Sequence, residues 1–289
     1  MSDRDDGRRE AAKRRGSVRR RRLAAAVAGL VVIAVALRLT VLAPVDTHGA
    51  RVSVIALDDD AAKSLAARGD DRIRVIAADV RRSEQVYAAF DTARESFGPV
   101  RSLITCAGIT KPGYFHELTD DDMQRQLDVN YFGTVWAVRA ALPDLRARRG
   151  STITCMSSAA GLLGVFGYGA YCPSKFAVRG LTEVLRQEYK ADGVTVTTVY
   201  PPDVDTPMLR GEQPLKPPEL LALSNGEKPL TAKQVARAML EGTESGRASV
   251  IPGAGTKLIA IASGAAPSLV ARYMDSFIAK ARRKATVAT

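Results

Sequence analysis

A buried strand, a helix and a second buried strand follow one another between residues 151 and 199, and this order restricts the fold more than any other feature. Residues 151–158 have the pattern of a buried strand and lead into small residues, and residues 171–188 show helical periodicity. Gly193 then ends the helix, and residues 194–199 are a β-branched run typical of a strand. Such a unit predicts parallel strands joined by a crossover helix, with ligands at the carboxyl edge of the sheet.

The same alternation continues on both sides of this unit. Further strands are expected at 49–57, 73–78, 103–105 and 248–251, and helices at 59–67, 83–97, 120–145 and 232–244. Thr119 and Thr231 are expected N-caps, because a threonine hydroxyl accepts from the free N–H groups of a first turn. The sequence therefore predicts an α/β fold, a Rossmann-like doubly wound parallel sheet in three layers, formed by residues 46–289.

Tyr171 and Lys175 stand four residues apart, which places both side chains on one face of the helix. Pro173 fits the first turn, so Tyr171 lies at the helix start. The positive end of the helix dipole and a nearby ammonium both favour a phenolate, so we expect a Tyr171 pKa below its ordinary ~10. Such a tyrosine exchanges a proton with a carbonyl or alcohol oxygen near neutral pH, and Ser158 is placed to hold that oxygen. The alternative is an ordinary amphipathic helix face.

At these positions the chain resembles the short-chain dehydrogenase/reductase family. Ser158, Tyr171 and Lys175 match its catalytic residues in type and spacing, and Asn130 matches the fourth. The resemblance implies an NAD(P)(H)-dependent oxidoreductase that interconverts a ketone and a secondary alcohol. In it Tyr171 donates the proton, while Lys175 lowers the tyrosine pKa and holds the nicotinamide ribose. Asn130 either satisfies backbone groups at a helix kink or holds a water that passes protons from Lys175.

Other motifs carry the same resemblance and imply NAD or NADP as cofactor, with NADP slightly favoured. The matching residues are Asp79 and Val80 for the adenine, Cys106, Ala107 and Gly108 for the family's Asn-Ala-Gly turn, and Pro201, Val204 and Thr206 for the nicotinamide turn. Leu57 stands where NADP-using relatives often have arginine. A metal site is not expected, because the chain has only two histidines and its three cysteines are scattered singly.

Residues 166–207 most resemble 3-ketodihydrosphingosine reductases, with which they share Tyr-Pro-Pro-Asp-x-Asp-Thr-Pro and Ser-Lys-Phe-Ala-x-Arg-Gly-Leu. The resemblance implies a lipophilic ketone substrate similar to 3-ketosphinganine. Residues 208–230, with four prolines, are expected to form a lid over the substrate. The apolar tail at 258–278 lines a lipophilic site, touches a bilayer or packs as ordinary core. The resemblance also implies a homo-oligomer formed through the helices at 120–145 and 173–190.

The beginning of the chain departs from the family pattern, because no Thr-Gly-x-x-x-Gly-x-Gly motif precedes Gly49. Residues 1–22 carry ten Lys/Arg against four Asp/Glu, and residues 23–37 are all apolar or glycine. Three interpretations of residues 1–45 are open. Residues 23–42 anchor a cytoplasmic catalytic domain to a membrane; a secretory signal ends near residues 41–43; or residues 31–42 replace the first strand and helix, with the phosphate loop lost. The first βα unit is thus atypical or lost.

That departure leaves a rival function open, a catalytically silent relative that keeps the fold and binds or scaffolds without holding a dinucleotide. The formal net charge of +11 is concentrated in the leader, and the rest of the chain has no basic stripe with interleaved aromatic residues. We therefore expect no nucleic-acid partner.

Overall fold

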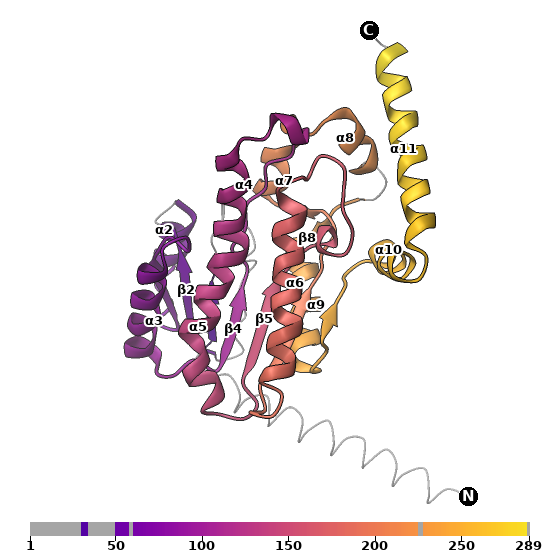
Figure 1. Ribbon diagram of the computed structural model, residues 1–289. Coiled ribbons are helices and arrows are strands. Elements are labelled where there is room, and N and C mark those ends of the chain that lie inside the picture. Colours follow the sequence, from indigo (N-terminus) through magenta and orange to yellow (C-terminus); the bar gives the residue numbers. More distant parts are fainter. Residues whose placement is uncertain (1–29, 34–49, 58–59, 225–227, 288–289) are drawn as a thin grey trace, which may run out of the picture.

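A computed structural model describes residues 30–33, 50–57, 60–224 and 228–287. In these residues a parallel seven-stranded sheet has the order β3-β2-β1-β4-β5-β6-β9 (Figure 1). Its strands are β1 (Leu30–Ile33), β2 (Val52–Ala56), β3 (Ile73–Ala77), β4 (Ser102–Thr105), β5 (Thr152–Met156), β6 (Thr195–Val199) and β9 (Ser249–Val250). The order reverses between β1 and β4, so the predicted Rossmann-like doubly wound sheet is confirmed.

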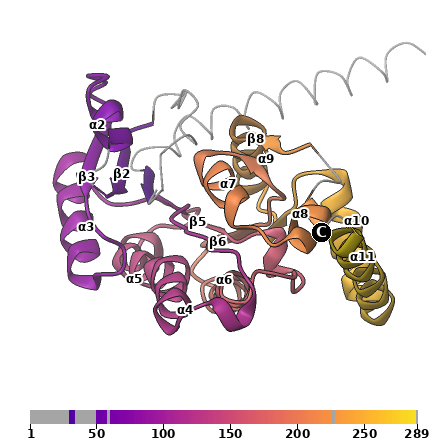
Figure 2. The ribbon, with the colours of Figure 1, turned by 90° about the horizontal axis from the view of Figure 1, so that it is seen from above.

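Helices cover both faces of the sheet and give the expected three layers (Figure 2). One face is covered by α3 (Ser83–Phe97), α5 (Gly133–Arg146) and α6 (Tyr171–Glu188), and the other by α2 (Asp60–Ala66) and α9 (Ala232–Glu244). The helix α4 (Asp120–Leu127) leads through a π-helical turn, η2 (Asp128–Phe132), into α5. Thr119 and Thr231 cap α4 and α9 as expected, each with a reciprocal capping box.

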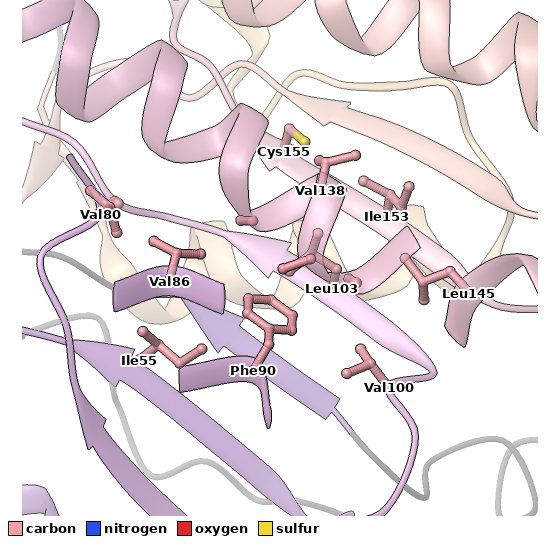
Figure 3. Close-up of a cluster of buried hydrophobic side chains, with 14 of the residues drawn as sticks. Ile55, Val80, Val86, Phe90, Val100, Leu103, Val138, Leu145, Ile153 and Cys155 are labelled. Atoms are coloured by element: carbon pink, nitrogen blue, oxygen red, sulfur yellow. The ribbon is translucent and has the colours of Figure 1, made fainter. Parts of the chain in front are cut away.

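The core lies between the sheet and the α3, α5 and α6 layer (Figure 3). Alternate residues of β2 serve opposite layers, because Ile55 packs in this core while Val52 and Val54 pack with Leu65 of α2. Phe90 of α3 is fully buried against the sheet. Burying one such side chain stabilises the fold by roughly 1.5–3 kcal/mol, which fixes the sheet that carries the polar residues at its carboxyl edge.

Four residues of the apolar leader segment are described, and they form β1 in the middle of the sheet, paired with β2 and β4. A membrane helix over residues 23–42 does not fit this placement, because Leu30–Ile33 are a strand. The position of β1 agrees instead with the interpretation in which residues 31–42 replace the first strand and helix. The other leader residues, and with them most of the anchor and signal interpretations, lie outside the described residues.

The expected lid is helical rather than an irregular loop. Its residues form α7 (Pro207–Glu212), the 3₁₀ turn η4 (Gln213–Leu215), α8 (Pro218–Ser224) and the start of β8 (Leu230–Thr231), which pairs with β7 (Val204–Asp205) just before the lid. Pro214 and Pro218 lie in first turns, where a missing N–H costs nothing, while Pro217 directly precedes α8 and Pro229 directly precedes β8. The prolines therefore do not prevent the helices.

The apolar tail forms α10 (Ala254–Ala265) and α11 (Pro267–Val287) at the edge of the molecule beside α8 (Figure 1). Arg282 fastens α11 to α8, because its Nε donates to Glu219 Oε1 over 2.8 Å. Within the described ranges, the apolar stretches of all helices are too short or too charged to cross a bilayer.

Candidate active site

A cavity of about 890 Å³ opens at the carboxyl edge of β4, β5 and β6. Its inner end is polar and holds the residues that the sequence singles out, Ser158, Tyr171 and Lys175, together with Cys106 and Gly108. Its outer walls are apolar and come from the lid helices and from α10 and α11. The size is in the usual range for a small-molecule site, in which apolar walls surround a few converging polar groups.

The structure brings Ser158, Tyr171 and Lys175 together. Ser158 follows β5 and caps the short turn η3 (Ala159–Gly161), where its Oγ accepts from Ala160 N over 3.2 Å. Tyr171 and Lys175 begin α6, and the Lys175 Nζ lies 5.7 Å from the centre of the Tyr171 ring. Both side chains are buried, at 9% and 3% exposure. The hydroxyls of Ser158 and Tyr171 therefore face one point in the cavity from two elements.

The expected low pKa of Tyr171 is wrong for the protein itself. Burial raises the pKa of Tyr171 above its ordinary value, and a hydrogen bond with Ser158 only partly opposes this. The nearby Glu212 carboxylate raises the pKa further. The Lys175 charge and the helix dipole, which the sequence reveals, lower the Tyr171 pKa. Desolvation, which depends on the folded structure, raises it and is the largest effect on a phenol in a closed cavity. Tyr171 is thus a neutral hydroxyl, the form that donates a proton.

Lys175 is held from two sides. Its Nζ donates to the Met156 carbonyl at the end of β5 over 3.1 Å, and its own carbonyl accepts from Ser157 Oγ over 2.9 Å. Burial lowers the pKa of Lys175 to about 8, although the Cys106 and Cys155 thiols act in the opposite direction. The ammonium therefore titrates within about a unit of neutral pH, where its proton is exchangeable.

Asn130 lies in the π-helical turn between α4 and α5 and is 1% exposed. Its Oδ1 accepts from Ile109 N over 2.8 Å, and its Nδ2 donates to Ile109 O at 3.0 Å and to Ser174 Oγ at 2.8 Å. The side chain thus satisfies backbone groups at a helix irregularity, the first of the two expected roles. The proton-relay role stays a prediction.

The Cys106, Ala107 and Gly108 turn follows β4 and reaches the inner end of the cavity. A Cβ on Gly108 would lie 3.3 Å from Asn130 Oδ1 and 3.4 Å from Lys175 Nζ, so the bare backbone leaves room beside these polar atoms. Burial raises the pKa of the Cys106 thiol to about 12, so it is a neutral group here rather than a nucleophile.

The adenine-side residues lie apart from this cavity, beyond β3. The Asp79 carboxylate is paired with Arg81, whose Nη2 lies 2.5 Å from Oδ2, and this hydrogen bond lowers the Asp79 pKa. Val80 is fully buried and packs directly on Gly133, where an added Cβ would come within 2.8 Å of Val80 Cγ2. Asp79 and Val80 therefore have clear structural roles beside the one that the resemblance implies.

The nicotinamide-turn residues return to the cavity. Pro201 and Val204 line it, and Thr206 caps α7 by accepting from Leu209 N over 3.3 Å. The Thr206 hydroxyl also donates to the Val204 carbonyl over 3.1 Å, which holds the turn against the start of the lid.

Two cavity residues were not singled out from the sequence. Tyr168 Oη donates to Glu212 Oε1 over 2.8 Å, and the Tyr168 ring lies 5.3 Å from the Tyr171 ring. Tyr168 stands three residues before Tyr171, just ahead of α6, and this spacing could have identified it from the sequence. Glu212 lies on α7, in a segment expected to be irregular, so nothing local indicated that its side chain points inward.

Curated proteins similar in sequence include the 3-ketodihydrosphingosine reductase of Dictyostelium discoideum, 39% identical over 62% of this chain and 54% of that protein. The mouse 3-ketodihydrosphingosine reductase is 36% identical over 76% of this chain and 69% of its own length. The 3-dehydrosphinganine reductase of Danio rerio is 36% identical over 69% and 62%. The chain thus spans between about half and two thirds of these relatives.

Solved structures show the same fold at low identity. A short chain dehydrogenase from Burkholderia cenocepacia, solved in complex with NADP, has a TM-score of 0.69 at 22% identity and covers 86% of this chain and 98% of its own. The family model for short chain dehydrogenases matches residues 40–216, which include every polar residue at the inner end of the cavity. On the sequence match, the sheet order and the position of these residues, the chain belongs to the short chain dehydrogenase family.

Proposed function

We propose that the protein is an NAD(P)(H)-dependent reductase that converts a lipophilic ketone into a secondary alcohol. The observation that carries this proposal is one cavity with Ser158, Tyr171 and Lys175 at its inner end and long apolar walls beyond them. A neutral phenol beside a second hydroxyl fits a carbonyl oxygen, and an apolar chain fits the walls.

The residues present fit the nicotinamide half of a dinucleotide. Gly108 has no side chain to cover Lys175 Nζ, and Gly108, Lys175, Pro201 and Val204 all line the cavity. Lys175 would hold the ribose, Val204 and Thr206 the carboxamide, and Asp79 and Val80 the adenine. When bound, the cofactor supplies the hydride for the carbonyl carbon. NADP is slightly favoured over NAD.

The chain's own residues then handle the proton. Ser158 Oγ donates to the substrate oxygen and fixes its position, while Tyr171 gives its hydroxyl proton to the same oxygen as charge develops there. The resulting phenolate lies near the Lys175 ammonium, which stabilises it and can return a proton. Asn130 would continue the proton path through a bound water, beside the bare backbone of Gly108.

The experiment that tests this function is reduction of ketones of increasing chain length, with 3-ketosphinganine as the longest, at saturating NADPH and then NADH. Each methylene buried in the apolar walls contributes about 0.8 kcal/mol, so kcat/KM should rise roughly fourfold per methylene until the cavity is filled. A flat series with measurable turnover would reject a lipophilic substrate.

A second candidate function is a catalytically silent relative, favoured by the segment between β1 and β2. Residues 34–51 contain a single glycine, Gly49, where family members have several that let the backbone approach a pyrophosphate. Absence of turnover with every ketone and both dinucleotides, from a protein with normal thermal unfolding, would support this candidate.

We further propose that α10 and α11 rest on an anionic membrane surface. Exposed apolar side chains here, Leu258, Ile261 and Leu269, are 65–68% exposed, and the exposed charges nearby are Lys257, Arg272, Lys280, Arg282 and Arg283 against Asp275. Apolar insertion with basic attraction is the usual mode of interfacial binding. Leu258→Glu/Ile261→Glu should weaken sedimentation with phosphatidylserine vesicles, whereas Leu240→Glu on α9, also exposed, should not.

The oligomer that the resemblance implies also stays a proposal. The α4–α5 and α6 helices lie side by side on one face (Figures 1 and 2), with Phe132, Phe176 and Val184 exposed by 36–48%. We propose a homodimer through this face. Phe176→Glu should shift the sedimentation coefficient to the monomer value, and Leu240→Glu should leave it unchanged.

A further inference from the structure

The cavity contains a second charged group of residues that the proposed proton transfer does not use. Glu212, at the end of α7, is 6% exposed and lines the cavity beside Tyr168. Lys216 has a fully buried side chain, and its Nζ lies 2.9 Å from Glu212 Oε1 and 3.8 Å from Asp203 Oδ2. The same Nζ donates to Ser224 Oγ over 3.4 Å. Charges are rarely buried this deeply unless they are paired or bind a ligand.

The group has one negative charge in excess, because the carboxylates of Asp203 and Glu212 face the single ammonium of Lys216. Two other cations lie along the cavity. Lys175 donates a hydrogen bond to the Met156 carbonyl at the inner end. Lys228 is exposed, so water and salt screen its charge. Among the charged groups that contact one another here, the carboxylates of Asp203 and Glu212 outnumber the ammonium of Lys216.

The Glu212 carboxylate can accept at least one further hydrogen bond. Its Oε1 takes the Tyr168 hydroxyl at 2.8 Å and the Lys216 ammonium at 2.9 Å. Its Oε2 has no hydrogen-bond partner among the described residues. A carboxylate has about four lone-pair positions, so a nine-tenths buried Glu212 with one free oxygen beside a cavity can take a further cationic donor.

The position of this oxygen relative to the reacting group limits what the donor can be. The Tyr168 ring that hydrogen-bonds to Glu212 lies 5.3 Å from the Tyr171 ring, one turn earlier in the chain. The charge of Glu212 also raises the pKa of Tyr171, as a carboxylate near that hydroxyl would. Glu212 thus lies on the Tyr168 side of the Tyr171 ring, at the end of the cavity that holds the reacting hydroxyl.

We propose that Glu212, supported by Asp203, binds an ammonium group carried close to the carbonyl of the substrate, so that the cavity selects long-chain 2-amino ketones. The inference rests on the proposed reductase function and adds the recognition of the amine to it. A protonated amine entering an apolar cavity loses its hydration, and a charge-assisted hydrogen bond to a carboxylate offsets that loss. Lys216 holds the Glu212 carboxylate in position through the 2.9 Å contact of its Nζ with Oε1.

The test compares three substrates of equal chain length: 3-ketosphinganine, its analogue without the amino group, and its N-acetyl derivative. For the wild-type protein kcat/KM should be at least about 10-fold higher for the free amine than for either analogue. Glu212→Gln should lower kcat/KM for the amine by roughly 10- to 100-fold and change the analogue without the amine by less than about threefold.

The matched control is Glu219→Gln, a carboxylate buried in the same lid but bonded to Tyr114 and Arg282 and not part of the cavity lining. It should leave the substrate preference unchanged. An equal loss for all three substrates in Glu212→Gln would show a structural role and overturn the inference. Equal wild-type kcat/KM for all three would overturn it without any variant, even if Glu212→Gln failed to fold. Reduction of none of them would instead overturn the reductase function, and the amine subsite with it.

Discussion

The Nζ of Lys175 lies 5.7 Å from the ring centre of Tyr171 and donates a hydrogen bond to the Met156 carbonyl. Among the described residues, none of the charges that act on this ammonium comes from a carboxylate, and burial lowers its pKa to about 8. Burying the charged Lys175 therefore destabilises the fold, as is common where function requires a buried charge.

The first prediction concerns the dependence of stability on pH. The folded-state pKa of Lys175 is below the unfolded value of 10.5, so the unfolded chain binds more protons between pH 8 and 10.5. The cost of burying the charge, about 3 kcal/mol, is present in full below pH 8 and disappears as the pH rises toward 10.5.

Lys175→Met removes this cost at every pH. The free energy of unfolding of Lys175→Met minus that of the wild type should therefore fall by about 2–3 kcal/mol between pH 7 and pH 10, measured by urea denaturation. A difference that stays constant over this range would mean that the Lys175 pKa is not lowered by folding.

The second prediction is that Tyr171→Phe abolishes turnover and leaves the fold intact. The variant removes one hydroxyl, whose proton transfer is worth about 10²–10⁴-fold in rate. Tyr87→Phe, at an exposed tyrosine on α3, is the control and should keep wild-type kcat. Wild-type turnover in Tyr171→Phe, with an unchanged melting temperature, would show that another group donates the proton.

The sequence predicted those elements that local signals define. The bounds of α3 and α9 agree with the expected ones, since α3 ends at Gly98 and α9 begins at the Thr231 capping box. Ser158, Tyr171 and Lys175 meet as expected because parallel strands and their crossover helix bring the end of β5 and the start of α6 together.

What the sequence did not predict depends on contacts between distant segments. The helices α7 and α8 within the lid were not predicted, and Glu212 is part of the cavity because it lies on α7. The raised pKa of Tyr171 and the π-helical turn at Asn130 result from burial and from bonds to Ile109 and Ser174, which no local pattern reveals.

The third prediction concerns Gly161, which lies under the start of α6. A Cβ there would meet Ser157 Oγ and lie 2.9 Å from the Lys175 carbonyl oxygen, so Gly161→Ala must displace the turn that holds Lys175. We expect a loss of about 1–3 kcal/mol in the free energy of unfolding and a lower kcat. Gly164→Ala, three residues on, meets nothing within 4 Å and should be close to neutral in both measurements. Equal effects of the two variants would contradict the packing argument.

The fourth prediction is weak binding of dinucleotides. Residues 34–51 connect the adjacent parallel strands β1 and β2, the place where the family's glycine-rich motif provides backbone N–H groups for a pyrophosphate, and they contain only Gly49. Losing two or three charge-assisted hydrogen bonds, at roughly 1.5–3 kcal/mol each, weakens affinity by about 100-fold or more.

Calorimetric titration with NADPH, NADH and the reduced nicotinamide mononucleotide measures this directly. The nicotinamide end of the site is formed by Gly108, Lys175 and Val204, so the mononucleotide should keep the contacts of this end, and the dinucleotides should gain only what Asp79 and Val80 add at the adenine. Lys175→Met should weaken all three ligands alike, because each has the ribose that Lys175 would hold. A micromolar dissociation constant for NADPH together with much weaker mononucleotide binding would show that another segment of the chain binds the pyrophosphate, and the glycine argument would then be wrong.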